Sequence, residues 1–343
     1  MSTQGELLED AFFHNDRERI RAVKNLKSGQ MFLAHYTDAQ NLFRILEGKS
    51  VFLRNARTLG DYTEIDHGFR LIEKAVGSPS GERLSGAITS IWPNYSLRTI
   101  WDLFVHNHML KIREETYVFS MCEHPVSGKA RDFGRLSMWR CYGGASRPVA
   151  LVINPFRSSF IQSDAVGMYT FPVEYVVPDG DGDDGLENWI LREFCAIADV
   201  LVSNRSQLSS VDPAIAAGYM MRSFHLMGVR SKHKAFEEEK EWRVVWTPYL
   251  AGPLPPGAIE ITNYFGYPQK ILRLNLGPYS VDLTTTIELS LNNILHKVLI
   301  GPASDADLVR HSVIAKLEEA GVRDAASRVE ITNIPLRTSG SRP

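Results

Sequence analysis

Residues 232–243, with the sequence KHKAFEEEKEWR, place a dense group of charges directly before an apolar Val-Val-Trp run. If residues 239–246 form a strand, side-chain alternation puts Glu239, Glu241 and Arg243 on one face. Two carboxylates and a guanidinium there cost free energy unless that face is exposed or functional. A solvated charged face is the alternative. The segment predicts a carboxylate site in which at least one of the two glutamates is functional.

A second candidate group is His35-Tyr36-Thr37-Asp38, which follows a short apolar run. Side chains at the end of a buried strand can face a cleft that the sheet holds rigid. The imidazole of His35 and the hydroxyl of Thr37 could bind a sugar hydroxyl or an amide by hydrogen bonds. The alternative is a core histidine whose ring is hydrogen-bonded to the backbone.

A third group lies within residues 137–144, SMWRCYGG. Trp139 and Tyr142 are three residues apart, so a short helix would place both on one aromatic face. Gly143 and Gly144 would then turn the chain into the next strand. Such a face suits stacking on a flat ring, and it equally suits packing in a core.

A fourth group is Gly60-Asp61-Tyr62-Thr63-Glu64. Asp61 and Glu64 share a face if a helix begins here, although Asp61 could simply be its N-cap. Residue types that bind metal ions are sparse in the rest of the sequence. Cys122, His124 and Cys141 give at most three zinc ligands without a standard spacing, so we expect no metal site.

The elements that must position these groups follow from hydrophobic periodicity and capping residues. An apolar run at 31–36 predicts a strand, an amphipathic helix follows at 39–47 and ends at Gly48, and residues 50–54 predict the next strand. Further strands are expected at 115–121, 148–153, 170–177, 239–246, 297–300 and 329–334. Helices are expected at 6–27, 61–76, 97–114, 135–142, 186–203, 212–230 and 304–320, with loops at 77–87 and 178–185.

This order of elements predicts an α+β fold without internal repeats or a domain linker. We expect residues 1–30 to form an N-terminal helical arm. We expect residues 31–340 to form a single α+β domain, with the helical patterns near 185–235 as an insertion within it.

The composition is that of an ordinary globular protein. The chain has 343 residues, 38 Lys and Arg against 40 Asp and Glu, a net charge of −2 and 44% hydrophobic residues. This excludes intrinsic disorder and gives no reason to expect a general polyanion binder. Three scattered cysteines point to a reducing compartment. The sequence has neither a signal peptide nor an apolar run of membrane-spanning length, so we expect a cytoplasmic protein without a membrane partner.

Taken together, the four groups resemble a bacterial family catalogued only as domain of unknown function 2971. The shared pattern runs in order across about residues 31–335, and its Glu-x-Glu-Trp-Arg segment is the most specific part. A Gly stands at position 60 where an Asn is expected. The shared motifs are His-Tyr-Thr at 35–37, Asp-x-x-Glu at 61–64, Ser-x-Trp-x-x-Tyr at 137–142, Lys…Phe-x-x-Glu-x-Glu-Trp-Arg at 232–243 and Ile-Gly-Pro at 300–302.

The arrangement is also similar, more distantly, to ADP-ribosyltransferases. Those enzymes place a His or Arg with Thr or Gly on the first strand, an aromatic element in the middle of the domain and a catalytic Glu on a later strand, often as Glu-x-Glu. The resemblance implies a mixed or antiparallel split sheet with a helical insertion. It also implies NAD as a substrate.

The same resemblance implies roles on the nicotinamide side. Tyr142 would stack on the nicotinamide ring, with Trp139 beside it. Glu241 would hold the 2′-hydroxyl of the nicotinamide ribose and stabilise positive charge on the sugar as the glycosidic bond breaks. Glu239 would orient the nucleophile, and the two glutamates could exchange these roles. Arg243 would either neutralise the carboxylate pair or bind the pyrophosphate.

On the adenosine side, the resemblance implies that His35 binds the ribose, that Thr37 supports the loop and that Tyr36 belongs to the same NAD-binding segment. The three groups then have to meet. His35, Tyr142 and Glu241 are expected to line one cleft, and the transferase interpretation fails if they lie on different faces.

The leading hypothesis is an ADP-ribosyltransferase-like enzyme, or an NAD glycohydrolase, that cleaves the nicotinamide glycosidic bond. Its acceptor would be a protein, a nucleic acid or water, and a toxin or anti-phage effector would suit this chemistry. One alternative is a non-catalytic module that binds a nucleotide or a partner. Another is a metal-dependent nucleic-acid enzyme that uses Asp61, Glu64, Glu239 and Glu241 as Mg²⁺ ligands.

Overall fold

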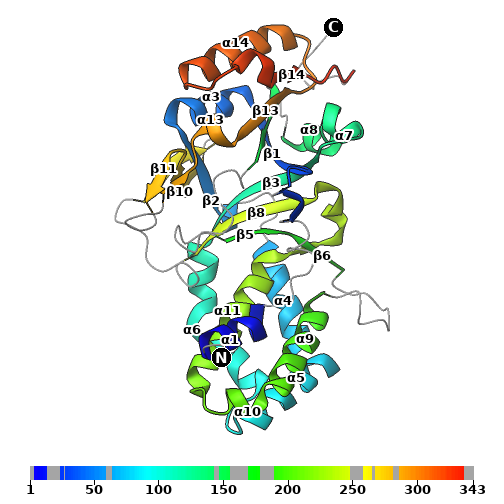
Figure 1. Ribbon diagram of the computed structural model, residues 1–343, viewed down its shortest axis with the longest axis vertical. Coiled ribbons are helices and arrows are strands. Elements are labelled where there is room, and N and C mark those ends of the chain that lie inside the picture. Colours follow the sequence, from blue (N-terminus) through cyan, green and yellow to red (C-terminus); the bar gives the residue numbers. More distant parts are fainter. Residues whose placement is uncertain are drawn as a thin grey trace.

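The computed structural model describes residues 4–13, 24–26, 28–58, 64–142, 147–154, 169–177, 189–247, 258–264, 267–280 and 286–335. A sheet with its covering helices occupies one end of an elongated molecule, and a group of helices occupies the other end (Figure 1). The expectation of an α+β protein is confirmed. Among the described helices, none has the length and apolar character that crossing a bilayer requires.

Among the described residues, the main sheet has ten strands, and its strand order is β14-β13-β4-β1-β3-β2-β10-β9, with β8 paired to β3 and β5 paired to β8. Its pairs are antiparallel except β13 with β14, so the sheet is mixed and mostly antiparallel. The strands are β1 (Met31–Asp38), β2 (Ser50–Asn55), β3 (Tyr117–Pro125), β4 (Pro148–Ile153), β5 (Tyr169–Pro172), β8 (Glu241–Trp246), β9 (Ile259–Tyr264), β10 (Tyr267–Asn275), β13 (Leu295–Ile300) and β14 (Val329–Ile331).

Four short strands form two separate pairs. β6 (Glu174–Val176) runs parallel to β7 (Ser231–His233), and β11 (Pro278–Ser280) is antiparallel to β12 (Thr286–Glu288). The single strand expected at 170–177 is therefore divided between β5, which joins the main sheet, and β6, which joins β7.

The sheet divides along strand β3. One edge of β3 pairs with β8 from Tyr117 to Cys122. The other edge pairs with β2 at Tyr117 and Val118 and with β1 from Cys122 onward. Between these two partners, residues 119–121 face a gap in the described strand pairing. β1 and β2 therefore lead away from β3 into two separate arms of the sheet.

Helices cover both faces of the β1 arm, and the alternating residues of β4 show which helix covers which face. Val149 and Leu151 pack with α3, α13 and α14, so we call this side the α3 face. Ala150 and Val152 pack with α8, so we call the other side the α8 face. The helices and 3₁₀ turns around the sheet are α3 (Ala39–Gly48), η1 (Ala56–Thr58), α7 (Lys129–Phe133), α8 (Leu136–Tyr142), η4 (Lys234–Glu239), α13 (Leu291–Ile294), α14 (Ala306–Glu319) and η5 (Ala325–Arg328).

α3 forms where the sequence predicts it, because its capping residues and its apolar face favour a helix over the same residues. The Asp38 carboxylate accepts a hydrogen bond from the backbone N of Asn41 at 2.7 Å and caps the N-terminus. Leu42 and Leu46 are buried on its inner face. The expected glycine stop is displaced by one residue, since Lys49 takes the left-handed conformation with φ 43°.

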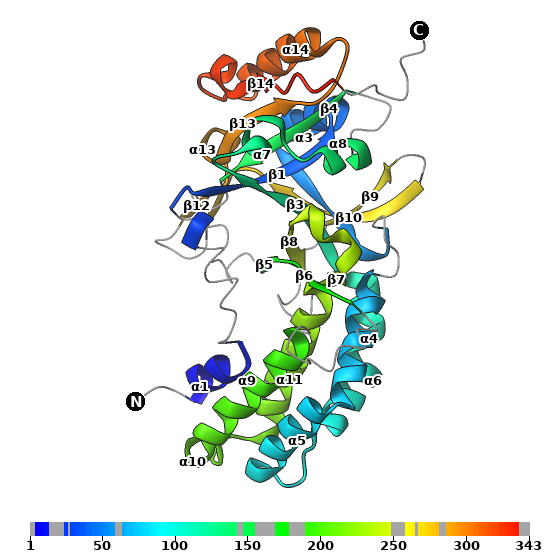
Figure 2. The same cartoon turned by 90° about the vertical axis from the view of Figure 1, so that its right-hand side faces the viewer.

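The helical end of the molecule has its own apolar core, to which seven helices contribute. The insertion predicted at 185–235 supplies only part of it, since helices from residues 64–115 pack against the predicted insertion (Figure 2). The loop predicted at 77–87 is wrong, because Ser78 caps a helix there and Pro79 occupies its first turn. The seven helices are α1 (Gln4–Phe13), α4 (Glu64–Val76), α5 (Pro79–Ile91), α6 (Leu97–Glu115), α9 (Trp189–Ser203), α10 (Arg205–Leu208) and α11 (Pro213–Arg230).

α4 and α11 approach closely at Gly68, where no room remains for a Cβ. A Cβ on Gly68 would overlap the carbonyl oxygen of Gly228. We expect Gly68→Ala to lower the free energy of unfolding by about 1–3 kcal/mol through overpacking. Gly218→Ala, on the open side of α11, is the control, because a Cβ there meets nothing within 4 Å. Urea unfolding of both variants checks this, and equal stability would contradict it.

Candidate functional site

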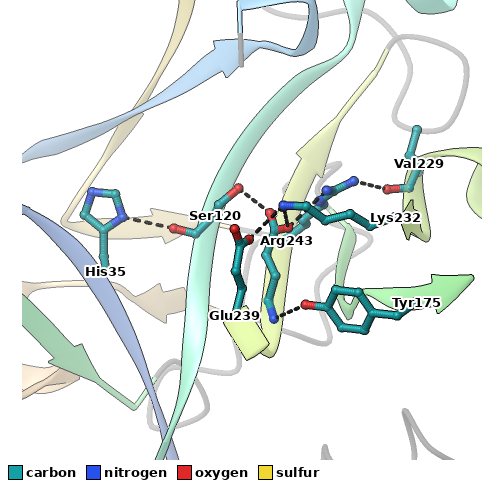
Figure 3. Close-up of polar contacts among 8 residues, drawn as sticks. His35, Ser120, Tyr175, Val229, Lys232, Glu239 and Arg243 are labelled. Atoms are coloured by element: carbon teal, nitrogen blue, oxygen red, sulfur yellow. Dashed lines mark hydrogen bonds and ion pairs between the residues drawn. The ribbon is translucent and has the colours of Figure 1, made fainter. Parts of the chain in front are cut away.

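Strand register brings four polar side chains together on the α8 face. Cys122 of β3 lies opposite Glu241 of β8, and Ser120 lies opposite Arg243. Directly opposed residues of an antiparallel pair share a face. Ser120, Cys122, Glu241 and Arg243 therefore form one patch. Figure 3 shows Ser120 and Arg243 of this patch together with Lys232 and Glu239.

Both carboxylate oxygens of Glu241 are fully engaged. Oε1 accepts from the Ser120 hydroxyl at 2.6 Å and from Arg243 Nε at 3.0 Å. Oε2 accepts from Lys232 Nζ at 2.9 Å and from Arg243 Nη2 at 3.1 Å. The backbone N of Glu241 donates to the Tyr175 hydroxyl at 2.8 Å. The side chain is thus held in one orientation by partners from β3, β7 and β8.

Glu241 is ionised although it is buried. Burial by itself would raise the pKa of this carboxyl, but the positive charges of Arg243 and Lys232 and its hydrogen bonds hold the pKa below its usual value. A buried charge persists only when it is paired in this way. The ion pairs therefore maintain a carboxylate inside the protein.

Glu239 lies close to Glu241 but belongs to a different element. It is the last residue of η4, and β8 begins only at Glu241, because Lys240 between them is left-handed with φ 47°. The prediction that Glu239 lies on the strand is wrong. Lys232 joins the two glutamates instead, because its Nζ donates to Glu239 Oε2 at 2.8 Å and to Glu241 Oε2 at 2.9 Å. We call Lys232, Glu239, Glu241 and Arg243 the carboxylate cluster.

The two glutamates differ in how far a ligand can reach them. The side chain of Glu239 is 16% exposed and that of Glu241 is 6% exposed. Tyr142 of α8 is half exposed, at 48%. The pKa of its phenol is raised, first by partial burial of the hydroxyl and then by the negative charge of Glu239. α8, which ends at Tyr142, packs against η4, which ends at Glu239. Among the described residues of this site, Glu239 and Tyr142 are more exposed to a bound molecule than Glu241 is.

Arg243 is enclosed. Its side chain is 2% exposed, and Nη1 donates to the backbone O of Val229 at 2.7 Å. Of the two roles expected for it, neutralisation of the carboxylate agrees with this environment. A contact with pyrophosphate is excluded, since the guanidinium is covered by protein.

His35 lies on the opposite side of the sheet. Ala34 pairs with Cys122 on the α8 face, so the next residue, His35, points to the α3 face. Its ring packs on Phe119 at 4.4 Å between centroids and lines an apolar cavity of about 40 Å³. The expectation that His35, Tyr142 and Glu241 line one cleft is wrong, because His35 lies on the α3 face and Glu241 lies on the α8 face. The transferase interpretation that requires the three residues to meet therefore fails in that form.

The His35 ring fills the gap in strand pairing along the edge of β3. Its Nδ1 donates to the backbone O of Ser120 at 2.9 Å, where neither β1 nor β2 supplies a strand partner (Figure 3). Burial lowers the pKa of His35, and this hydrogen bond opposes the shift only partly, so the ring is held neutral. The core histidine bonded to backbone, one of the two interpretations of this group, is the one observed.

Removing the N–H donor of His35 is expected to lower the stability of the protein rather than any catalytic activity. His35→Leu leaves the Ser120 carbonyl unpaired and should cost about 1–3 kcal/mol, whereas His35→Gln keeps an N–H and should cost less. Chemical denaturation of both variants measures this. Since His35 faces away from the carboxylate cluster, any catalytic activity per folded molecule should stay within a few-fold. A stable His35→Leu variant that loses its activity would contradict this placement.

The other residues assigned to NAD on the first strand and on α8 are core residues. Tyr36 packs edge-on against Trp139, with ring centroids 4.7 Å apart, and its hydroxyl accepts from the backbone N of Arg135. Trp139 is buried and donates to the backbone O of Phe133 at 2.7 Å. Thr37 is buried as well. Trp139 and Tyr142 therefore do not form one exposed aromatic face.

Some predicted positions lie outside the described residues. Asp61 is one of them. Glu64 begins α4, but its side chain is not among those described. The others are Gly60, Gly143, Gly144 and the acidic tract at 178–185. Within the described part of the chain, no group of three or more His, Cys, Asp or Glu side chains is placed to hold a metal ion.

Two members of the site were missed. Ser120 hydrogen-bonds Glu241 by its hydroxyl and His35 by its carbonyl, and Tyr175 anchors the start of β8. A signal for Ser120 exists in the sequence, because it is the lone polar residue inside the apolar strand core YVFSM. Tyr175 gives no such signal, since its role depends on the pairing of β6 with β7.

Comparison with family models, with curated proteins and with solved structures gives no match to this chain. The resemblances described for the sequence therefore stay predictions. The geometry of the carboxylate cluster carries the functional argument.

Proposed function

We propose that the protein binds NAD on the α8 face and breaks the bond between nicotinamide and ribose. The observation that carries this proposal is a partly exposed carboxylate, Glu239, which a buried lysine ties to a second, enclosed carboxylate beside a half-exposed tyrosine. The proposal is narrower than the transferase interpretation drawn from the sequence, because that interpretation required His35 in the same cleft as Glu241. The division of the sheet at β3 is compatible with the split sheet of ADP-ribosyltransferases, and this fold assignment belongs to the narrower proposal.

In this mechanism Glu239 faces the nicotinamide ribose. As the C–N bond breaks, nicotinamide leaves with the bonding electron pair and positive charge develops on the sugar. A fixed carboxylate lowers the energy of that charge in the transition state. Water, or a nucleophile of a protein or nucleic acid, then adds to the anomeric carbon and releases one proton.

The remaining residues position these groups. Glu241 holds Lys232, and Lys232 holds Glu239, so the enclosed carboxylate acts through the lysine. Tyr142 stacks on the nicotinamide ring from α8. This assigns substrate contact to Glu239, whereas the sequence leaves the choice between Glu239 and Glu241 open. His35 has no part in it, because it lies on the α3 face.

The test is the release of nicotinamide from NAD by the purified protein, measured by chromatography, together with NAD binding measured by calorimetry. We expect nicotinamide to form in proportion to protein and time. Absence of both binding and release, with and without candidate protein and nucleic-acid acceptors, would overturn the proposal.

A second candidate is a non-catalytic module that binds a nucleotide or a partner. The observation in its favour is the complete pairing of Glu241, which leaves an internally neutralised cluster of two carboxylates and two cations. It predicts saturable NAD binding with no product. The calorimetry and chromatography above separate the two candidates directly.

A further inference from the structure

Strand β9 lies at one end of the main sheet and has an open edge. Among the described strands it pairs with β10 alone. Figure 2 shows β9 and β10 projecting from the sheet at one side of the molecule. β14, at the other end of the strand order, has three residues, whereas β9 has six. An exposed edge of this length is a template on which another strand can pair.

The hydrogen bonds between β9 and β10 show which backbone groups of β9 face outward. The backbone N of Arg273 donates to the backbone O of Ala258, so these two opposed residues form a hydrogen-bonded pair. Such pairs alternate along an antiparallel ladder, so every second residue of β9 faces away from β10. The N–H and C=O groups that face outward belong to Ile259, Ile261 and Asn263. Within the described part of the chain these groups make no hydrogen bond.

The side chains of β9 do not protect this edge from another strand. Ile261 is 76% exposed and Ile259 is 39% exposed, and both lie on the same face of the strand. Natural sheets commonly protect an open edge with Lys or Pro. β9, with the sequence IEITNY, has neither. Its one charged residue, Glu260, is held by Arg273, whose Nε and Nη2 each donate to the carboxylate at 2.7 Å. The edge is therefore apolar and unblocked.

A second copy of the chain fits this edge, because β9 is complementary to itself. Antiparallel pairing about a twofold axis at Ile261 places each outward-facing residue opposite another outward-facing residue. Ile261 then lies opposite Ile261 of the second copy, and Ile259 lies opposite Asn263 of the second copy. Each of these pairs exchanges both of its N–H···O bonds. On the other face, Glu260 lies opposite Thr262 of the second copy, whose hydroxyl can donate to the carboxylate.

The neighbouring registers of the same pairing are less favourable. Moving the twofold axis to Glu260 brings two carboxylates directly opposite each other, which is destabilising. Moving it to Thr262 places each Ile261 opposite Asn263 and sets Ile259 opposite a residue beyond the end of β9. The axis at Ile261 therefore keeps like charges apart and covers the most exposed apolar side chain of the edge.

We propose that the protein forms a symmetric dimer in which the β9 strands of two copies pair antiparallel across a twofold axis at Ile261. The main sheet then continues from one copy into the other. β2 and β10 separate β9 from β3, which carries Ser120, so the dimer contact lies apart from the carboxylate cluster. Because one pair of edge strands buries a small area, the association is reversible and depends on protein concentration.

Sedimentation equilibrium of the full chain over a wide range of concentrations measures this association. We expect a monomer–dimer equilibrium that Ile261→Lys weakens by about 100-fold or more, since two ammonium groups then lie opposite each other. Ile261→Pro removes an N–H that makes no bond to β10, so it should weaken the dimer while circular dichroism shows the fold retained. Ile215→Lys is the matched control and should leave the dimer unchanged, because Ile215 is 53% exposed on α11 at the helical end of the molecule.

A mixture of two variants tests the register directly. Ile261→Glu by itself should be as defective as Ile261→Lys, but mixing the two variants places opposite charges across the axis. The mixture should associate about tenfold more tightly than either variant alone. A wild type that stays monomeric at every concentration, leaving the β9 edge to a strand of another protein, would overturn the proposal. Equal dimerisation of the wild type and Ile261→Lys, or a mixture that associates no better than its components, would overturn it as well.

Discussion

Glu241→Gln is expected to lower the free energy of unfolding by about 3–5 kcal/mol, because breaking a buried ion pair leaves an uncompensated charge. Gln has the same shape but no charge, so Lys232 and Arg243 lose their shared partner while both stay buried. Guanidinium unfolding monitored by circular dichroism measures the change. Glu237→Gln is the matched control, since Glu237 pairs with Lys240 on the surface, and it should shift stability by less than about 1 kcal/mol.

The same substitution should change the dependence of stability on pH. The pKa of Glu241 is lowered in the folded protein, so its contribution is complete above the unfolded value near 4.5. It is lost as pH falls through the lower folded value. The difference between wild type and Glu241→Gln should therefore be largest near neutral pH and shrink in acid. A constant difference, or a loss below about 1 kcal/mol at pH 7, would contradict a buried paired carboxylate.

Glu239→Gln is expected to reduce nicotinamide release by about 100-fold or more, the size of effect seen when one fixed group that stabilises transition-state charge is removed. Stability should fall much less, by about 1–2 kcal/mol, because Lys232 keeps Glu241 as its partner. Initial rates at saturating NAD, compared with unfolding curves of the same preparations, give both quantities. Glu238→Gln is the control, since that side chain is exposed and next in sequence.

This comparison also distinguishes the two glutamates. If Glu239→Gln retains activity while a folded Glu241→Gln preparation loses it, the enclosed carboxylate contacts the sugar and the assignment is reversed. If both retain activity, the cleavage site lies elsewhere. A fall in kcat at unchanged KM would place the role of Glu239 in the transition state.

The sequence alone determined which segments carry the chemistry. Alternation and capping located β1, α3, β2, β4 and β8, because these signals depend only on residues close in the chain. Burying two carboxylates before an apolar strand costs free energy, and this indicated a role for Glu239, Glu241 and Arg243. The structure brings all three into one cluster.

Local pattern could not locate several other elements. β9 and β10 were missed, and the Gly, Ser and Pro residues at 77–87 suggested a loop although they begin α5. α5 is stabilised by burial of Leu84, Ile88 and Ile91 in a core that it shares with helices distant in the sequence. Tertiary packing here outweighs intrinsic preference.

Only the tertiary structure decided what each polar side chain faces. His35 and Ser120 are 85 residues apart, and their hydrogen bond exists because the sheet divides at β3. Lys232 is close in sequence to both glutamates, but the path of the chain through η4 decides that its ammonium contacts both carboxylates. A strand pattern gives two faces but does not say which one another element covers. That choice is made by long-range pairing, and it separates His35 from the carboxylate cluster.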